Sequence, residues 1–98
     1  MRILVSDDHP IICIALGEML KAAFPDESTV IDFAKDSDEL LSHLDAGEFD
    51  LLVLDLMMPG RLQSVRLLEA IAAREPELRI VVYTGQAHPS LAGIRPEQ

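Results

Sequence analysis

The chain has 98 residues, 49% hydrophobic and 26% charged, so it can pack the core of one small domain and is not a low-complexity disordered segment. No apolar run approaches the roughly 20 residues that span a bilayer, and no signal-peptide core precedes Asp7 and Asp8. The single cysteine, Cys13, excludes a disulfide framework and a multi-cysteine zinc site. The net charge of −9 disfavours direct binding of this segment to nucleic acid, and we expect a cytoplasmic chain without membrane contact.

Short apolar runs rich in β-branched residues alternate along the chain with longer segments of helical periodicity. Strands are expected at residues 3–5, 29–31, 51–54 and 80–83, and helices at 10–24, 37–46 and from 64 to just before Pro76. Pro10 suits a first helical turn, Asp36 and Glu39 have the spacing of a capping box, and Gly47 suits a helix end. The alternation predicts an α/β domain whose parallel sheet is covered by helices on both faces.

Polar side chains follow three of the four predicted strands. Asp7 and Asp8 follow the first strand, Asp55 follows the third, and Thr84 follows the fourth. Ligands of open parallel sheets bind outside the carboxyl ends of the strands. If the first and third strands are neighbours, the three carboxylates converge and repel one another unless a cation lies among them.

Hard oxygen ligands, with no His or Cys expected beside them, favour Mg²⁺ or Mn²⁺ over zinc, and Mg²⁺ readily accepts phosphate oxygens. The pattern therefore points to phosphoryl chemistry, in which Asp55 could attack a phosphoryl group and Thr84 could donate its hydroxyl to a phosphoryl oxygen. Taken singly, each Asp is better explained as a turn or capping residue, and Asp8 could cap the helix at Pro10. We interpret His9 as a capping residue and Cys13 as a core or boundary residue.

Three runs of the sequence resemble the receiver domain of bacterial two-component response regulators: Asp7-Asp8-His9-Pro10-Ile11, Leu54-Asp55-Leu56-Met57-Met58-Pro59-Gly60 and Val82-Tyr83-Thr84-Gly85. The Asp-Asp-His-Pro opening looks most like the regulators with a LuxR-type helix-turn-helix output domain, and the resemblance covers about residues 2–85.

This resemblance implies a flavodoxin-like fold with the third strand beside the first. Asp55 would be the phosphoacceptor for a sensor histidine kinase, so the chain would be a signalling partner and not an enzyme. Asp7, Asp8, Asp55 and the backbone carbonyl of Met57 would hold Mg²⁺, and Thr84 would contact the phosphoryl group.

The sequence departs from the family pattern at two places. Leu62 and Gln63 stand where the family usually has Asp-Gly, which puts the start of the third helix in doubt. The family's fifth strand with its lysine, and its last helix, are missing, and the lysines present are Lys21 and Lys35. We therefore expect an incomplete receiver-like domain over 1–85, an irregular tail over 86–98, retained metal binding, and slow or absent phosphorylation of Asp55.

Without a fifth strand, the strand at 80–83 would be an apolar edge, so we expect a dimer or higher oligomer that covers this edge. One alternative function is a pseudo-receiver, an interaction module that works without phosphorylation. A second alternative, a hydrolase of the haloacid dehalogenase type, requires an Asp two residues after the nucleophile, where this chain has Met57.

Overall fold

The computed structural model describes residues 1–83, which form a four-stranded, all-parallel sheet with three helices. The sheet has the order β2-β1-β3-β4, so the third strand lies beside the first, as the resemblance implies. The elements in chain order are β1 (Arg2–Ser6), α1 (Pro10–Ala23), β2 (Val30–Ala34), α2 (Ser37–Ala46), β3 (Leu51–Asp55), α3 (Ser64–Arg74) and β4 (Arg79–Tyr83). The predicted flavodoxin-like α/β class is confirmed, with all seven elements in the expected order.

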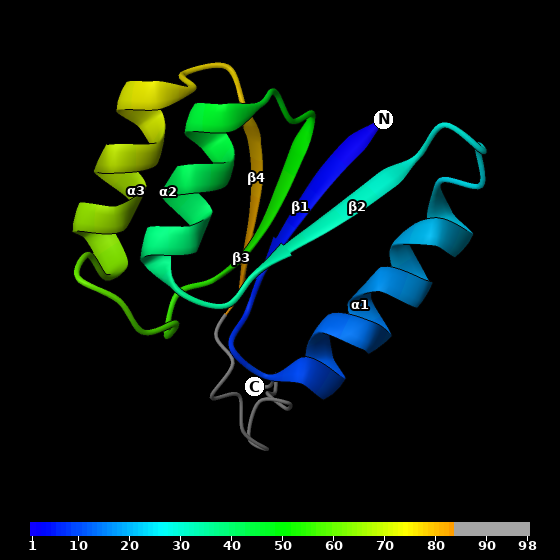
Figure 1. Cartoon of the computed structure of the whole chain (residues 1–98), viewed down its shortest axis with the longest axis horizontal. Helices are drawn as coiled ribbons and strands as arrows, with labels where there is room; N and C mark the ends of the chain where they lie inside the picture. The colour runs from blue at the N-terminus through cyan, green and yellow to red at the C-terminus, as the bar shows by residue number, and fades with distance from the viewer. Residues whose placement is uncertain (84–98) are drawn as a thin grey trace, which may run out of the picture.

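Helices cover both faces of the sheet: α1 lies on one side, and α2 and α3 lie together on the other (Figure 1). The larger core cluster lies on the side of α2 and α3 and includes Leu4, Leu52 and Leu54 from the two central strands. The smaller cluster joins Ile3 and other strand residues to the inner face of α1. The alternation of side chains along β1 and β3 therefore supplies both cores from the same two strands.

The second strand is longer than the apolar run that predicted it. It extends from Val30 to Ala34 and contains Asp32, a polar residue that ended the run in the sequence. The Asp32 carboxylate pairs with Nε of Arg2 on the neighbouring strand at 3.3 Å. Because β2 is an edge strand, this side chain keeps contact with solvent, and the strand continues past it.

The ends of α2 follow the signals in the sequence. Asp36 is the N-cap, and its side chain accepts a hydrogen bond from the backbone N–H of Glu39 at 2.8 Å. Gly47 is the C-cap, and its N–H donates to the carbonyl of His43. The helix thus begins and ends where capping chemistry predicts.

The loop between β3 and α3 has the unusual sequence at Leu62 and Gln63, yet α3 begins at Ser64 as predicted. Ser64 has a φ of 53°, in the left-handed region that non-glycine residues rarely adopt. The N-cap, Gln63, makes no side-chain capping hydrogen bond. The loop just before α3 is tied to α2 instead, where the N–H of Leu62 donates to the hydroxyl of Ser37 at 3.3 Å.

The fourth strand is the edge of the sheet opposite β2 within residues 1–83, and it carries exposed apolar side chains. Val81 is 54% exposed and Val82 is 42% exposed, and the two point to opposite faces. Among the described residues this strand therefore carries two exposed apolar side chains, and the oligomer expected to cover them stays a prediction. The predicted tail at 86–98 lies outside the described residues, and no helix among residues 1–83 is long and apolar enough to cross a membrane.

Candidate functional site

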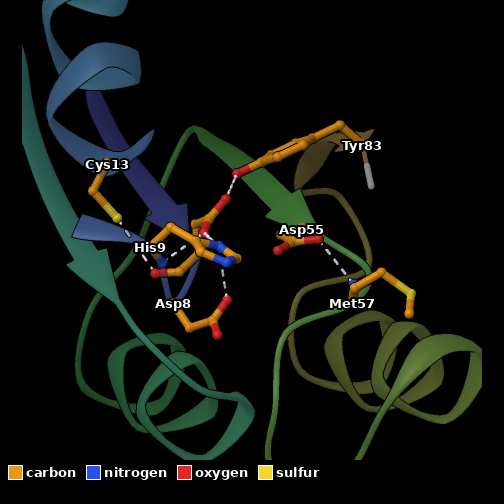
Figure 2. A network of polar contacts seen from close by, with 7 residues as sticks. Asp8, His9, Cys13, Asp55, Met57 and Tyr83 are labelled. Atoms are coloured by element: carbon orange, nitrogen blue, oxygen red, sulfur yellow. Dashed lines mark hydrogen bonds and ion pairs between the residues drawn. The ribbon is translucent and has the colours of Figure 1, made fainter. Parts of the chain in front are cut away.

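The three carboxylates predicted to converge do so at the carboxyl ends of β1 and β3. Asp7 follows β1 directly and Asp55 ends β3, and both residues are 1% exposed. The side chain of Asp8 is 35% exposed. Together with His9 these residues offer ligand atoms that all lie within 4.8 Å of one another. Figure 2 shows Asp8 and His9 on the β1 side of this cluster, which we call the acid site, and Asp55 on the β3 side.

Backbone hydrogen bonds hold the acid site in place from both sides. The N–H of Asp7 donates to the carbonyl of Ala34 at the end of β2, and the N–H of Leu56 donates to the carbonyl of Tyr83 at the end of β4, each at 2.9 Å. Oδ1 of Asp55 accepts the N–H of Met57 at 2.9 Å. The carboxylates therefore stand on backbone that is fixed by the sheet.

Of the two methionines that follow β3, Met58 is fully buried in the larger core cluster, whereas Met57 is 54% exposed. The side chain of Met57 thus takes no part in the core. Its N–H contacts Asp55, and its place two residues after Asp55 is the one that the resemblance gives to a carbonyl ligand of the metal.

His9 belongs to the acid site, contrary to the expectation that no His lies beside the carboxylates. Its Nδ1 lies 2.8 Å from Oδ1 of Asp7 and 3.2 Å from Oδ1 of Asp8, and its backbone N–H donates to Oδ1 of Asp7. The hydrogen bond to Asp7 and the charge of Asp8 raise the pKa of His9 above its ordinary 6.5. His9 is the N-cap residue of α1, as interpreted from the sequence, although its side chain forms no capping hydrogen bond. Asp8 does not occupy the N-cap position, so the capping interpretation of Asp8 is wrong.

Tyr83 is a second member of the acid site that the sequence analysis did not identify. Its hydroxyl donates a hydrogen bond to Oδ2 of Asp7, and its ring lies on the same face of the sheet as Asp55, its register partner. Burial, followed by the hydrogen bond to Asp7, raises the pKa of the Tyr83 hydroxyl. The alternation of side chains along the strands could have predicted this position, because residues paired in register on adjacent strands point to the same face of the sheet.

Cys13, on the first turn of α1, contacts the acid site through its thiol, which donates to the carbonyl of Asp7 at 3.3 Å. It is partly buried, as expected of a boundary residue, and burial together with the charges of Asp7 and Asp8 raises the pKa of its thiol. A groove of about 450 Å³ lies beside it, bounded by Asp7, Asp8 and apolar side chains such as Ile14 and Phe33. The groove therefore borders the acid site at Asp7 and Asp8.

Two further predictions concern residues outside this cluster. Thr84 lies outside the described residues. Lys21 stands on α1, and Lys35 follows β2, where its Nζ pairs with Glu39 at 3.7 Å. Lys35, which lines the groove, therefore forms its ion pair with a residue of α2.

The donor set of the acid site fits a divalent cation. Three carboxylates supply hard oxygen donors, which Mg²⁺ and Mn²⁺ prefer, and His9 adds one nitrogen. Two of the carboxylates are buried, and a buried charge requires a partner of opposite sign. The ion pairs of Asp7 and Asp8 within residues 1–83 are made with His9, whose charge depends on its protonation.

A parallel α/β sheet with an acid site at its carboxyl edge defines a class of ligand-binding domain, and comparison identifies its family. The response regulator receiver domain model matches residues 3–94, so the chain belongs to this family. It is 29% identical over 86 residues to the transcriptional regulatory protein ComA of Bacillus subtilis (strain 168) and 28% identical over 93 residues to the transcriptional regulatory protein RcsB of Escherichia coli (strain K12). These relatives are LuxR-type regulators, as the opening motif predicts.

The alignments cover 86% and 93% of the chain but 39% and 42% of the relatives, so the chain spans about two fifths of their length. Among solved structures, the non-phosphorylated receiver domain of Escherichia coli RcsB has a TM-score of 0.75 at 27% identity, covering 94% of the chain and 70% of the receiver. RcsB of Salmonella typhimurium has a TM-score of 0.76 at 29% identity, covering 93% of the chain and 46% of RcsB. A structure of two RcsB dimers bound to two parallel DNAs has a TM-score of 0.75 at 29% identity, with coverages of 86% and 43%.

Proposed function

We propose that the chain is a phosphoacceptor in a two-component phosphorelay and takes a phosphoryl group from a sensor histidine kinase onto Asp55. The observation that carries the proposal is the convergence of Asp7, Asp8 and Asp55, with ligand atoms within 4.8 Å of one another, in a member of the receiver family. The transfer modifies the protein's own carboxylate. We therefore propose a signalling role and not an enzymatic one.

In the proposed step, a carboxylate oxygen of Asp55 forms a bond to phosphorus while the P–N bond of the kinase phosphohistidine breaks. The electron pair of that bond stays on the imidazole nitrogen, which then takes a proton from solvent. Asp55 is suited to this role because β3 fixes its backbone and the N–H of Met57 orients its carboxylate. Positioning of this kind is the main contribution that a protein makes to phosphoryl transfer.

The residues proposed to hold Mg²⁺ are Asp7, Asp8, Asp55 and the backbone carbonyl of Met57. When bound, Mg²⁺ neutralises part of the negative charge of the phosphoryl group. Asp7 and Asp8 contribute oxygens from the end of β1, and Asp55 contributes one from the end of β3. Thr84, the residue after β4, is proposed to donate its hydroxyl to a phosphoryl oxygen.

We propose that phosphorylation of this 98-residue chain is slow, although cation binding is retained. Phosphorylation adds negative charge beside three carboxylates, and a nearby lysine would offset part of it. The two lysines of the sequence are Lys21 on α1 and Lys35, which pairs with Glu39. The cation ligands are all present in the described residues.

The proposed partners are a sensor histidine kinase and a second copy of the chain that pairs at the edge of β4. The exposed Val81 and Val82 on this edge support the second partner. The relative RcsB has been solved as dimers bound to DNA. The net charge of −9 supports a role for this segment without direct contact to nucleic acid or membrane, and we propose a cytoplasmic location.

A second function remains as an outcome of the test: an interaction module that works without phosphorylation. Leu62 and Gln63, in the place of the family's Asp-Gly, favour it. The test is intact-mass spectrometry after incubation with Mg²⁺ and an acyl phosphate donor, with Asp55→Asn as the matched control. Added phosphoryl mass on the wild type alone supports the phosphoacceptor. No added mass on folded protein that still binds Mg²⁺ favours the interaction module.

A further inference from the structure

We propose that Tyr83 is a positioning residue of the acid site, whose hydroxyl holds the Asp7 carboxylate in the orientation that binds the divalent cation. This inference rests on the proposed function, because the cation is the one assigned to Asp7, Asp8 and Asp55. It concerns a residue of β4 that lies one position before Thr84.

The hydrogen bonds of Asp7 fix both of its carboxylate oxygens. Oδ1 accepts the backbone N–H of His9 and lies 2.8 Å from its ring Nδ1, and Oδ2 accepts the hydroxyl of Tyr83. Figure 2 shows Tyr83 reaching from β4 toward the residues at the end of β1, with Asp55 below this link on β3. A carboxylate held at both oxygens cannot rotate away from the cation-binding face.

The two partners of Asp7 differ in how firmly they are themselves held. The side chain of His9 is 56% exposed, so its ring is packed on few sides. The ring of Tyr83 packs against the smaller core cluster with Ile3, Val5 and Val53. The Tyr83 hydroxyl is thus the more rigid of the two contacts. Partners that hydrogen-bond to metal-ligating carboxylates typically contribute about 10- to 100-fold to metal affinity.

The ring and the hydroxyl of Tyr83 can be separated by experiment, because Tyr83→Phe keeps the packed ring and removes only the donor. We expect Tyr83→Phe to weaken Mg²⁺ binding, measured by isothermal titration calorimetry, by about 10- to 100-fold while the far-ultraviolet circular dichroism is unchanged. The matched control is Thr29→Val, which removes another buried hydroxyl donor, one that bonds to the carbonyl of Phe24 at 3.0 Å. Thr29 lies at the opposite end of the sheet, so this variant should keep the wild-type affinity.

A second measurement uses the wild type alone. Tyr83 is the single tyrosine of a chain without tryptophan, so tyrosine fluorescence reports on this side chain. Cation binding at Asp7 should change that fluorescence with the same dissociation constant as calorimetry gives. If Tyr83→Phe does not fold, this fluorescence titration of the wild type tests the positioning role of Tyr83 instead. Unchanged tyrosine emission at saturating Mg²⁺ overturns the inference.

The outcomes separate this inference from the proposed function. A wild type that binds neither Mg²⁺ nor Mn²⁺ overturns both. A wild type that binds Mg²⁺, beside a folded Tyr83→Phe variant that binds it equally well or more tightly, overturns only the positioning role. Weaker binding by Tyr83→Phe and also by Thr29→Val likewise overturns it, because the effect would then follow general stability.

Discussion

A Cβ atom at Gly60 would lie 1.8 Å from Oγ of Ser37, so the loop after β3 and the N-terminus of α2 meet with no room for a side chain. Ser37 is fully buried; its N–H donates to the carbonyl of Pro59 at 2.9 Å, and its hydroxyl accepts the N–H of Leu62 at 3.3 Å. This contact fixes the loop that follows Asp55 and Met57 to a separate element. The geometry behind the acid site therefore depends on the close approach at Gly60.

Gly60→Ala should destabilise the fold. Gly60 has a φ of +136°, which L-residues rarely adopt, and the added Cβ would also lie 2.7 Å from the backbone nitrogen of Ser37. Backbone strain and overpacking together should lower the free energy of unfolding by roughly 2 to 4 kcal/mol. Urea unfolding followed by circular dichroism measures this loss.

Gly17→Ala is the matched control for that substitution. Gly17 lies inside α1, and a Cβ there would meet only the ring of Phe33, at 3.3 Å. Phe33 is 44% exposed, so its ring has room to move, and alanine favours a helix interior by roughly 0.5 to 1 kcal/mol over glycine. A loss for Gly17→Ala as large as that for Gly60→Ala would contradict the role given to the contact with Ser37.

Much of the fold follows from the sequence, because its physical signals are local. Asp36 and Gly47 mark the ends of α2 through capping chemistry, and the apolar runs mark the four strands. Asp32 is an exception, since its pairing with Arg2 on the neighbouring strand extends β2 beyond the run. Such a contact depends on which strands are adjacent, which periodicity does not encode.

Some residues of the acid site could likewise be predicted from local sequence signals, whereas others depend on contacts between distant segments. Asp7, Asp8 and Asp55 could be predicted because each follows a strand whose neighbours could be inferred. His9 could not, because its ring orientation depends on how the chain turns into α1. Tyr83 depends on the register between β3 and β4, and a shift of one residue would place its ring on the other face.

The pKa of His9 should report on the charge of the acid site. Because the folded-state pKa is raised above 6.5, the stabilisation from His9 is fully present below pH 6.5 and is lost as pH rises through the folded value. Nuclear magnetic resonance titration of the His9 ring, assigned by its loss in His9→Gln, measures the pKa. Mg²⁺ should lower it, because a cation among the carboxylates opposes the imidazolium charge.

Asp8→Asn provides the control for this titration. The charge of Asp8 is the second largest cause of the raised pKa, after the hydrogen bond to Asp7. The variant should therefore lower the pKa of His9 part of the way toward 6.5. A His9 pKa that neither Asp8→Asn nor Mg²⁺ changes would show that the ring does not contact the acid site in solution.

The hydroxyl of Tyr83 should stay protonated in the folded protein beyond pH 10.0, its ordinary pKa, because burial and the hydrogen bond to Asp7 raise the pKa. The contribution of protonated Tyr83 to the stability of the fold is thus complete below pH 10 and is lost as pH rises above it. Because Tyr83 is the single tyrosine, near-ultraviolet phenolate absorbance follows it directly. Absorbance should rise near pH 10 in denaturant and later in the folded chain. Phenolate forming near pH 10 in both would refute the buried contact.

The edge of β4 should mediate self-association. Val81 and Val82 are exposed on opposite faces of β4, which is an edge strand among residues 1–83, and exposed apolar edges pair with other strands. Light scattering should therefore give a dimer or larger mass for the wild type. Val81→Lys combined with Val82→Lys should give a monomer, because lysine on an edge strand opposes pairing.

Val65→Lys, at a valine 65% exposed on α3, is the matched control and should keep the wild-type mass. A wild type that stays monomeric at every concentration would exclude this interface, because pairing at an exposed edge depends on concentration.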